Sequence, residues 1–102
     1  MGQSLAMNKL KELQQWYLSH CDGVWEHSYG VKIETLDNPG WYVTIDLADT
    51  ELAARSFSEV QRLERDELNW IHCRVAEGKF EGRGGPLMLE EIVKIFLVWA
   101  TA

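Results

Sequence analysis

The chain has 102 residues, of which 46% are apolar and 25% charged, and a formal net charge of −6. This length suits one domain with a single core, and no apolar run reaches the ~18 residues that a membrane span requires. The acidic balance disfavours nucleic acid as a direct ligand, because the phosphates would be repelled. Cys21 and Cys73 are too few for a disulfide framework, so we expect reduced thiols, a cytoplasmic location and no membrane partner.

The first part of the chain is expected to be helical. We expect residues 1–6 to be a tag or a short extension, because Met7 would serve as a natural start. Apolar residues then recur at helical spacing and predict a helix from about Leu5 to His20. The pair Asp22-Gly23 supplies the stop, because glycine is the usual residue at a left-handed helix end.

A β-hairpin follows. Alternation of apolar and polar residues predicts strands at Val31–Thr35 and Trp41–Leu47. Between them, Pro39 presets φ at the second position of a turn, and Gly40 is expected to accept a positive φ at the third position.

The segment 48–69 allows two interpretations. Apolar residues from Phe57 to Leu68 fit a helical spacing. The alternative, which we favour, is a loop through Arg55 and then a twisted strand at 59–65, because the strand expected next needs a neighbour.

The last part of the chain predicts a second hairpin and a helix. Strands are expected at Trp70–Val75 and Lys79–Glu81, joined by a turn at Glu77-Gly78, and a helix from Pro86 to about Trp99. The chain is therefore expected to be one α+β domain over residues 1–102. An antiparallel sheet of four to five strands would follow the first helix and carry the last helix on its face.

Negative charge is concentrated in one segment. Between Asp22 and Glu51 lie seven acids and one base, Lys32, so this segment alone sums to −6 and the remainder is neutral. Such a field can steer a basic partner, although a solvated acidic face that serves only solubility is an equally good interpretation. Two large aromatic residues, an acid and a histidine fall within Trp25–Tyr29.

A thiol enzyme is the rival hypothesis. His72 and Cys73, followed by Lys79, resemble the anion-binding loop of a cysteine phosphatase, but Glu77 would repel phosphate there. A buried structural cysteine on a strand is the more common outcome. Adjacent His-Cys pairs at His20 and His72 also fail the usual spacing of zinc ligands, so no metal or cofactor is expected. Glu26 and His27 could form an acid–base pair with Asp22, but no nucleophile accompanies them, so a partner-binding or structural role is favoured.

Several blocks of the sequence resemble the immunity protein 53 family. The similarity spans about Met7 to Ala100 and is carried by LQQWYLSHCDG (Leu13–Gly23), WEHSYGVKIETLDNPGW (Trp25–Trp41), VTIDL (Val43–Leu47), NWIHCRV (Asn69–Val75) and GKFEG (Gly78–Gly82). The resemblance implies a small bacterial α+β protein of a polymorphic toxin system, which binds a cognate toxin and blocks it without catalysis. The residues that we expect to contact a basic toxin are Asp22, Trp25, Glu26, His27, Tyr29 and Asp46.

The chain also departs from the family's pattern. The family tends to have an acid at the position of Val24 and more polar residues near Leu63, Leu68, Met88, Val93 and Val98. These differences suggest a divergent or re-engineered surface whose binding role has changed.

The final helix suggests a homodimer. Its apolar residues cover an arc of about 200°, whereas a helix on one sheet needs little more than about 100°. We therefore expect Val93, Leu97 and Val98 to pair with a second copy, unless the first helix or the loop at 48–58 covers the extra face. A scaffold whose only activity is self-association is the third hypothesis.

Overall fold

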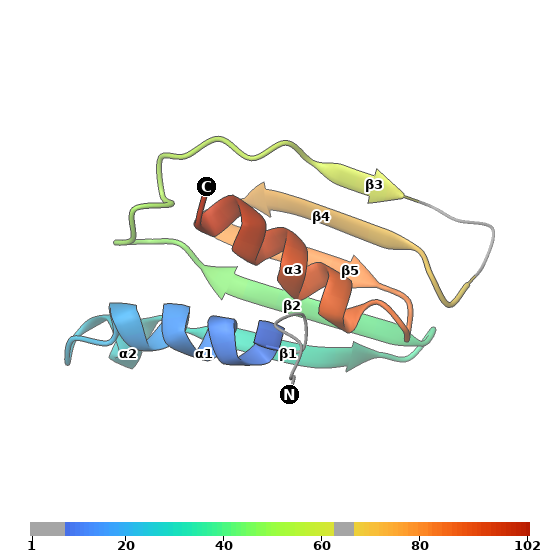
Figure 1. The fold of residues 1–102 in the computed structure, drawn as a ribbon, viewed down its shortest axis with the longest axis horizontal. Coiled ribbons are helices and arrows are strands. Elements are labelled where there is room, and N and C mark those ends of the chain that lie inside the picture. The colour runs from blue at the N-terminus through green and yellow to red at the C-terminus, as the bar shows by residue number, and fades with distance from the viewer. Residues whose placement is uncertain (1–7, 63–66) are drawn as a thin grey trace, which may run out of the picture.

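The computed structural model describes residues 8–62 and 67–102, and its centre is a five-stranded antiparallel sheet. Its spatial order is β1-β2-β5-β4-β3, which places β1 and β3 at the two edges (Figure 1). The strands are β1 (Val31–Leu36), β2 (Gly40–Asp46), β3 (Val60–Arg62), β4 (Ile71–Ala76) and β5 (Lys79–Gly84). Both predicted hairpins are present, as β1–β2 and β4–β5.

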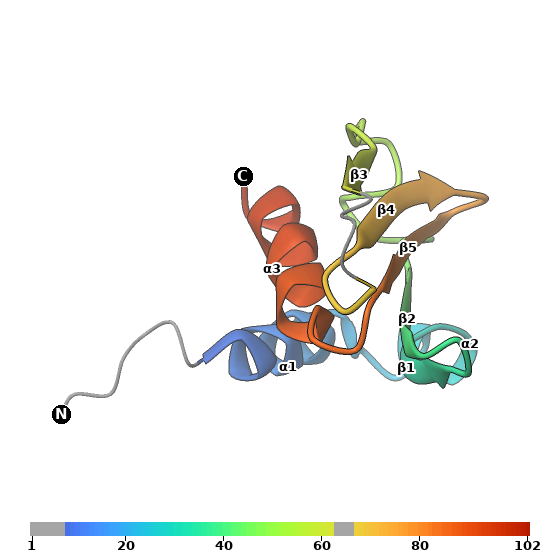
Figure 2. The same cartoon turned by 90° about the vertical axis from the view of Figure 1, so that its right-hand side faces the viewer.

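Two long helices lie on the same face of this sheet. They are α1 (Lys9–His20) and α3 (Leu89–Ala100), and both stand on one side of the strands in the edge-on view of Figure 2. The short helix α2 (Trp25–Ser28) lies at the end of the sheet where β1 begins (Figure 1). The α+β prediction is therefore confirmed. None of the helices in the described ranges has the length and apolarity that crossing a bilayer would need.

The structure resolves the ambiguity of segment 48–69 in favour of a strand. Turns occupy most of the stretch after β2, and β3 then pairs antiparallel with β4, with Val60 opposite Cys73. The predicted strand at 59–65 is thus confirmed at residues 60–62, and the helical alternative is wrong there. The rest of that prediction, at residues 63–65, and the predicted extension at 1–6 lie outside the described residues.

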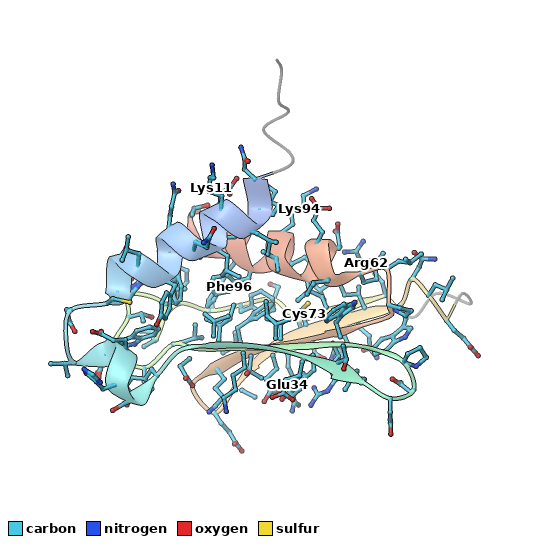
Figure 3. All side chains as sticks on the ribbon, turned by 90° about the horizontal axis from the view of Figure 1, so that it is seen from below. Lys11, Glu34, Arg62, Cys73, Lys94 and Phe96 are labelled. Carbon is cyan, nitrogen blue, oxygen red and sulfur yellow. The ribbon has the colours of Figure 1, made fainter. Side chains whose placement is uncertain are left out.

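The core lies between the sheet and the two long helices. Alternate residues of the central strands point to the helices and are fully buried, among them Val43 and Ile45 of β2. Phe80 from the central strand meets Phe96 of α3 at a ring-centroid distance of 5.2 Å, and the two rings are inclined at 62°. Figure 3 shows Phe96 and Cys73 in this layer.

The turn chemistry is confirmed at one hairpin and wrong at the other. Glu77 and Gly78 both have positive φ, at 53° and 77°, as a tight two-residue turn requires. Gly40 does not have the positive φ that we expected. It lies inside β2, where an added Cβ would stand 2.3 Å from the carbonyl oxygen of Gly84 on the neighbouring strand β5. Close backbone approach, rather than turn conformation, explains this glycine.

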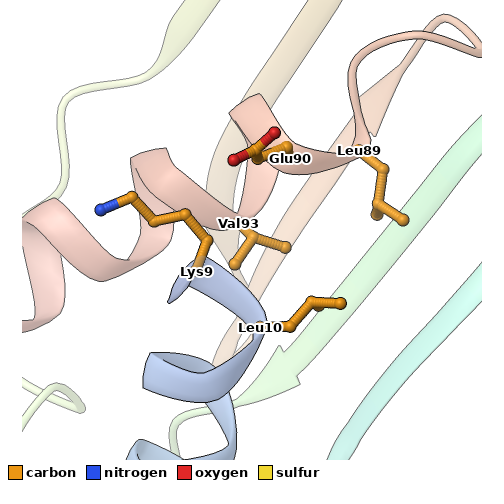
Figure 4. A pocket seen from close by; sticks show the side chains of 5 residues that line it. All are labelled: Lys9, Leu10, Leu89, Glu90 and Val93. Atoms are coloured by element: carbon orange, nitrogen blue, oxygen red, sulfur yellow. The ribbon is translucent and has the colours of Figure 1, made fainter. Parts of the chain in front are cut away.

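The wide apolar arc of α3 is covered largely from within the chain. Val93 and Leu97 are only 1% and 4% exposed. Val93 faces the start of α1, where it lines a groove of about 240 Å³ with Lys9 and Leu10 (Figure 4). Contrary to our prediction, Val93 and Leu97 are core residues, and of the three residues predicted for self-association only Val98, 60% exposed, is on the surface.

The loop between β2 and β3 covers the other flank of α3. The guanidinium of Arg55 donates to the carbonyl of Trp99 at 2.9 Å, and the indole N–H of Trp99 donates to the carbonyl of Ser56 at 2.8 Å. The ring of Phe57 packs edge-on against Trp99, with centroids 5.1 Å apart. Both of the covering elements that our prediction weighed, the first helix and this loop, are therefore in contact with α3.

Candidate functional site

Trp25 lies at the centre of the end of the molecule where most of the predicted binding residues meet. Its side chain is 4% exposed, and its ring lies about 6 Å from the rings of Trp16, Tyr17 and Tyr29. The indole N–H donates to the carbonyl of Ala48 at 2.9 Å. Trp25 thus ties α1, α2 and the loop after β2 together. We expected it to be a partner-binding anchor, but it is a core residue.

Asp22 and Glu26 hold the turn that leads into α2. The Oδ1 atom of Asp22 accepts hydrogen bonds from the backbone N–H groups of Val24 and Trp25, at 2.9 and 3.0 Å. The carboxylate of Glu26 reaches back to the N–H groups of Asp22 and Gly23, at 2.9 and 2.7 Å. These reciprocal bonds resemble a capping box, although Asp22 lies two residues before Val24, the N-cap of α2, and the second acid follows it by four residues instead of three.

These hydrogen bonds keep both carboxyl groups ionised. The N–H groups of Trp25 and Val24 lower the pKa of Asp22. The pKa of Glu26 is lowered by its own backbone N–H and by those of Gly23 and Asp22. Both predicted binding residues therefore carry negative charge, but each also has a structural role. Sequence reasoning missed that role, although the Asp-Gly-x-x-Glu spacing at residues 22–26 is a signal for it.

Asp46 and Tyr29 also belong to this end of the molecule. The Oδ2 atom of Asp46 accepts the N–H of Gly30 at 2.9 Å, and its Oδ1 atom lies 3.3 Å from the ammonium of Lys79. Tyr29 is half-buried against Trp25. His27, on α2, is exposed. The structure thus gathers all six predicted residues at one end, with Asp22 and His27 the most accessible.

His20 and Glu51 join α1 to the loop after β2, and sequence reasoning did not single out this pair. The Nε2 atom of His20 lies 2.8 Å from the Oε1 atom of Glu51, and its Nδ1 atom lies 2.9 Å from the carbonyl of Trp16. Burial lowers the pKa of His20, but the hydrogen bonds to the carbonyl of Trp16 and to the carboxylate of Glu51 outweigh burial, so the pKa is raised above the ordinary value of 6.5. The hydrogen bond from His20 lowers the pKa of Glu51.

The pair makes the stability of this end depend on pH. Because the pKa of His20 is raised in the folded state, its contribution is complete below the unfolded pKa and is lost as pH rises through the folded pKa. We expect His20→Gln to lower the free energy of unfolding by up to about 1 kcal/mol at pH 6, and by less at pH 9. Urea unfolding at a series of pH values measures this difference. The exposed His27→Gln is the control, and an equal pH trend in both variants would contradict the assignment.

The surface around these residues combines acids with apolar side chains. Leu18 and Val24 are 69% and 72% exposed. Asp22 binds the backbone of Trp25, the indole of Trp25 binds the carbonyl of Ala48 next to Asp49, and Glu51 binds His20, so these acids lie beside the end of α1 and α2. We call Leu18, Asp22, Val24, Asp49 and Glu51 the acidic end. Val24 is one of the predicted departures from the family's pattern, and it lies fully on this surface. Among the other departures, Leu68 and Val98 are also exposed, and Val93 is buried.

The thiol-enzyme hypothesis has no geometric support. Cys73 is fully buried on the helix side of the sheet, where burial raises its pKa to about 12. His72 points to the opposite face and pairs with Glu59, and Lys79 pairs with Asp46. Both Cys21 and Cys73 are free thiols. Within residues 8–62 and 67–102, no three His, Cys, Asp or Glu side chains form a group that could hold a metal ion.

Comparison with known proteins agrees with the resemblance. A family model described as Immunity protein 53 matches residues 10–101, nearly the whole chain. No curated protein and no solved structure gives a match to the chain. The resemblance read from the sequence blocks is therefore confirmed.

Proposed function

Because the chain belongs to the immunity protein 53 family, we propose that it binds a cognate bacterial toxin and neutralises it by covering the toxin's active site. The family match over residues 10–101 is the observation that carries this proposal. Binding alone is sufficient for such a role, so the protein needs no catalytic centre of its own. The place of action would be the cytoplasm of the producing cell, where the toxin would otherwise act.

The acidic end is the surface that we assign to the toxin. Its ionised carboxylates would attract a basic toxin domain and speed its approach. Leu18 and Val24 would supply the apolar contact at the centre, a role that buried Trp25 cannot fill. Glu26 and Tyr29, which are partly accessible, would complete the contact.

Neutralising the acidic end tests this assignment. Asp49→Asn and Glu51→Gln remove two charges, and glutamine can keep the hydrogen bond to His20. We expect the double variant to bind its cognate toxin, for which the product of the gene immediately upstream is the candidate to be tried, with an association rate about three- to tenfold lower at low salt, and with a weaker salt dependence. Surface plasmon resonance at several salt concentrations measures both quantities.

A matched control removes the same charge elsewhere. Asp37, in the β1–β2 turn, and Glu90, at the start of α3, are both exposed and lie at the opposite end of the molecule from α2 (Figure 1). Asp37→Asn/Glu90→Gln should leave the association rate nearly unchanged. Equal effects of the two double variants would show that net charge alone matters, and would refute the acidic end as the binding surface. Reversal at Glu26 or Asp46 is less informative, because both hold backbone groups.

A further inference from the structure

The edge strand β1 has an open side. It pairs with β2 on one side only, since β1 is the first strand in the order of the sheet. Four of its six residues are exposed, and the other two are half-buried. Figure 3 looks at the molecule from below Figure 1, and there no helix or other strand stands in front of this edge.

The register identifies which backbone groups point outward. The N–H of Asp46 donates to the carbonyl of Gly30 at 3.1 Å, so Lys32 and Glu34, at even spacing from Gly30, also direct their backbone groups to β2. The N–H and C=O groups of Val31, Ile33 and Thr35 therefore point away from the sheet. In the described residues these outward groups have no hydrogen-bond partner. Such an edge is a template for a further strand.

We infer that β1 pairs antiparallel with β1 of a second copy of this chain, which joins two sheets into one across a two-fold axis. The outward N–H and C=O groups of the two β1 strands can form hydrogen bonds with each other when the two-fold axis passes through Lys32, Ile33 or Glu34. An axis at Lys32 would place the two copies of Lys32 opposite each other, and an axis at Glu34 would do the same with Glu34, so like charges would face each other. An axis at Ile33 places Lys32 of each copy opposite Glu34 of the other.

Charge therefore selects one register. In the Ile33-centred register, Lys32 and Glu34 form two symmetric ion pairs on the outer face of the joined sheet. Within the described chain neither residue makes an ion pair, whereas Asp46 pairs with Lys79 and Glu81 with Arg74 on the same face. Figure 3 shows Glu34 on this outer face, away from the helices. The charges of Lys32 and Glu34 on one β1 strand are therefore complementary to those of Glu34 and Lys32 on the other.

The helix side of the same edge has room for the second copy's side chains. Leu13, Gln14, Tyr17 and Val31 line a cavity of about 280 Å³ between α1 and the start of β1. In the Ile33-centred register, Thr35 of the second copy lies opposite Val31. Ile33, which is 39% exposed, would pack against its own copy. The edge thus offers apolar contact on one face and charge pairing on the other.

Sedimentation velocity and light scattering over a concentration series test the dimer. Because a six-residue strand pair buries little area, we expect Kd on the order of 10–100 µM. Lys32→Glu or Glu34→Lys alone should raise Kd about tenfold or more, since like charges then face each other twice. The double swap Lys32→Glu/Glu34→Lys restores both pairs and should return Kd to within about threefold of the wild type. Lys11→Glu, on the far side of α1 (Figure 3), is the control for net charge.

A backbone variant provides an independent test. Ile33→Pro removes an N–H that is unused in the monomer and places a ring at the centre of the proposed contact. It should abolish the dimer, while Ile33→Val should keep it. Circular dichroism and thermal unfolding verify that each variant is folded, and the charge variants remain decisive if the proline variant is not.

Two outcomes would overturn the dimer, and a third would overturn its register. A wild type that stays monomeric over the whole series refutes it, and so does a dimer that Ile33→Pro leaves intact. A double swap that fails to rescue dimerisation refutes the Ile33-centred register. If the variants instead weaken toxin binding while the wild type remains a monomer, the edge belongs to the toxin and not to a second copy. The assignment of the acidic end is tested separately, so the two proposals can fail independently.

Discussion

Replacing Trp25 with alanine is expected to lower the free energy of unfolding by about 3–5 kcal/mol. The side chain is 4% exposed and lies among Trp16, Tyr17 and Tyr29, so truncation would leave a cavity at the junction of α1, α2 and the loop after β2. It also leaves the carbonyl of Ala48 without its indole donor. Urea unfolding followed by circular dichroism measures the change.

Trp25→Phe separates the two contributions. Phenylalanine keeps most of the aromatic packing and loses only the hydrogen bond and part of the ring, so we expect a smaller loss of about 1–2 kcal/mol. If Trp25→Ala left stability unchanged and instead weakened toxin binding, Trp25 would be the exposed anchor that the sequence alone suggested. That result would contradict the buried position described above.

The burial of Trp25 shows where sequence reasoning fails in this chain. Its apolar neighbour Val24 is exposed and its other neighbour, Glu26, is charged, and the four residues of α2 are too few to show a helical period. The group that accepts its indole N–H is Ala48, 23 residues further along the chain. Burial here depends on a contact between distant segments, and no local pattern reports such a contact.

The hairpins were predictable because their signals are local. In β1 and β2, apolar and polar residues alternate, and a short turn joins the two strands. Together these features predict an antiparallel pair with the apolar residues on one face, and Val31 is indeed opposite Ile45. The short strand β3 was ambiguous, because its three residues carry little periodicity. The better argument came from the strand predicted next, β4, which needed a neighbour, and β3 is that neighbour, with Val60 opposite Cys73.

The apolar arc of α3 carried real information, although it was assigned to the wrong partner. An arc of about 200° correctly indicates contacts on more than one side. In the structure these contacts come from the sheet, from α1 at Val93, and from the loop at Arg55 and Phe57. A helix whose additional contacts come from inside the chain and a helix that pairs with a second copy have the same sequence pattern. Only the tertiary structure distinguishes them.

The charges of this protein also divide into two kinds. Asp22, Glu26 and Asp46 are carboxyl groups that accept backbone N–H donors, so replacing them would disturb the fold as well as change the charge. Asp49 lies exposed in the same region, and Glu51 is half exposed although it binds His20. This division is the reason that the binding test uses Asp49 and Glu51, where neutralisation disturbs the fold least.

Gly82→Ala is expected to destabilise the packing of α3 on the sheet by about 1–3 kcal/mol. Gly82 is buried in β5, and an added Cβ would lie 2.4 Å from Cγ2 of Ile92 and 3.2 Å from Cε2 of Phe80. Both neighbours are fully buried, and the β-branched Ile92 cannot easily turn away, so the helix or the strand must shift.

The matched control is Gly30→Ala, because an added Cβ there meets nothing within 4 Å and the residue is outside the left-handed region. We expect the control to change the free energy of unfolding by less than about 0.5 kcal/mol, as measured by urea unfolding. Equal stability of the two variants would mean that α3 does not approach β5 as closely as the structure shows.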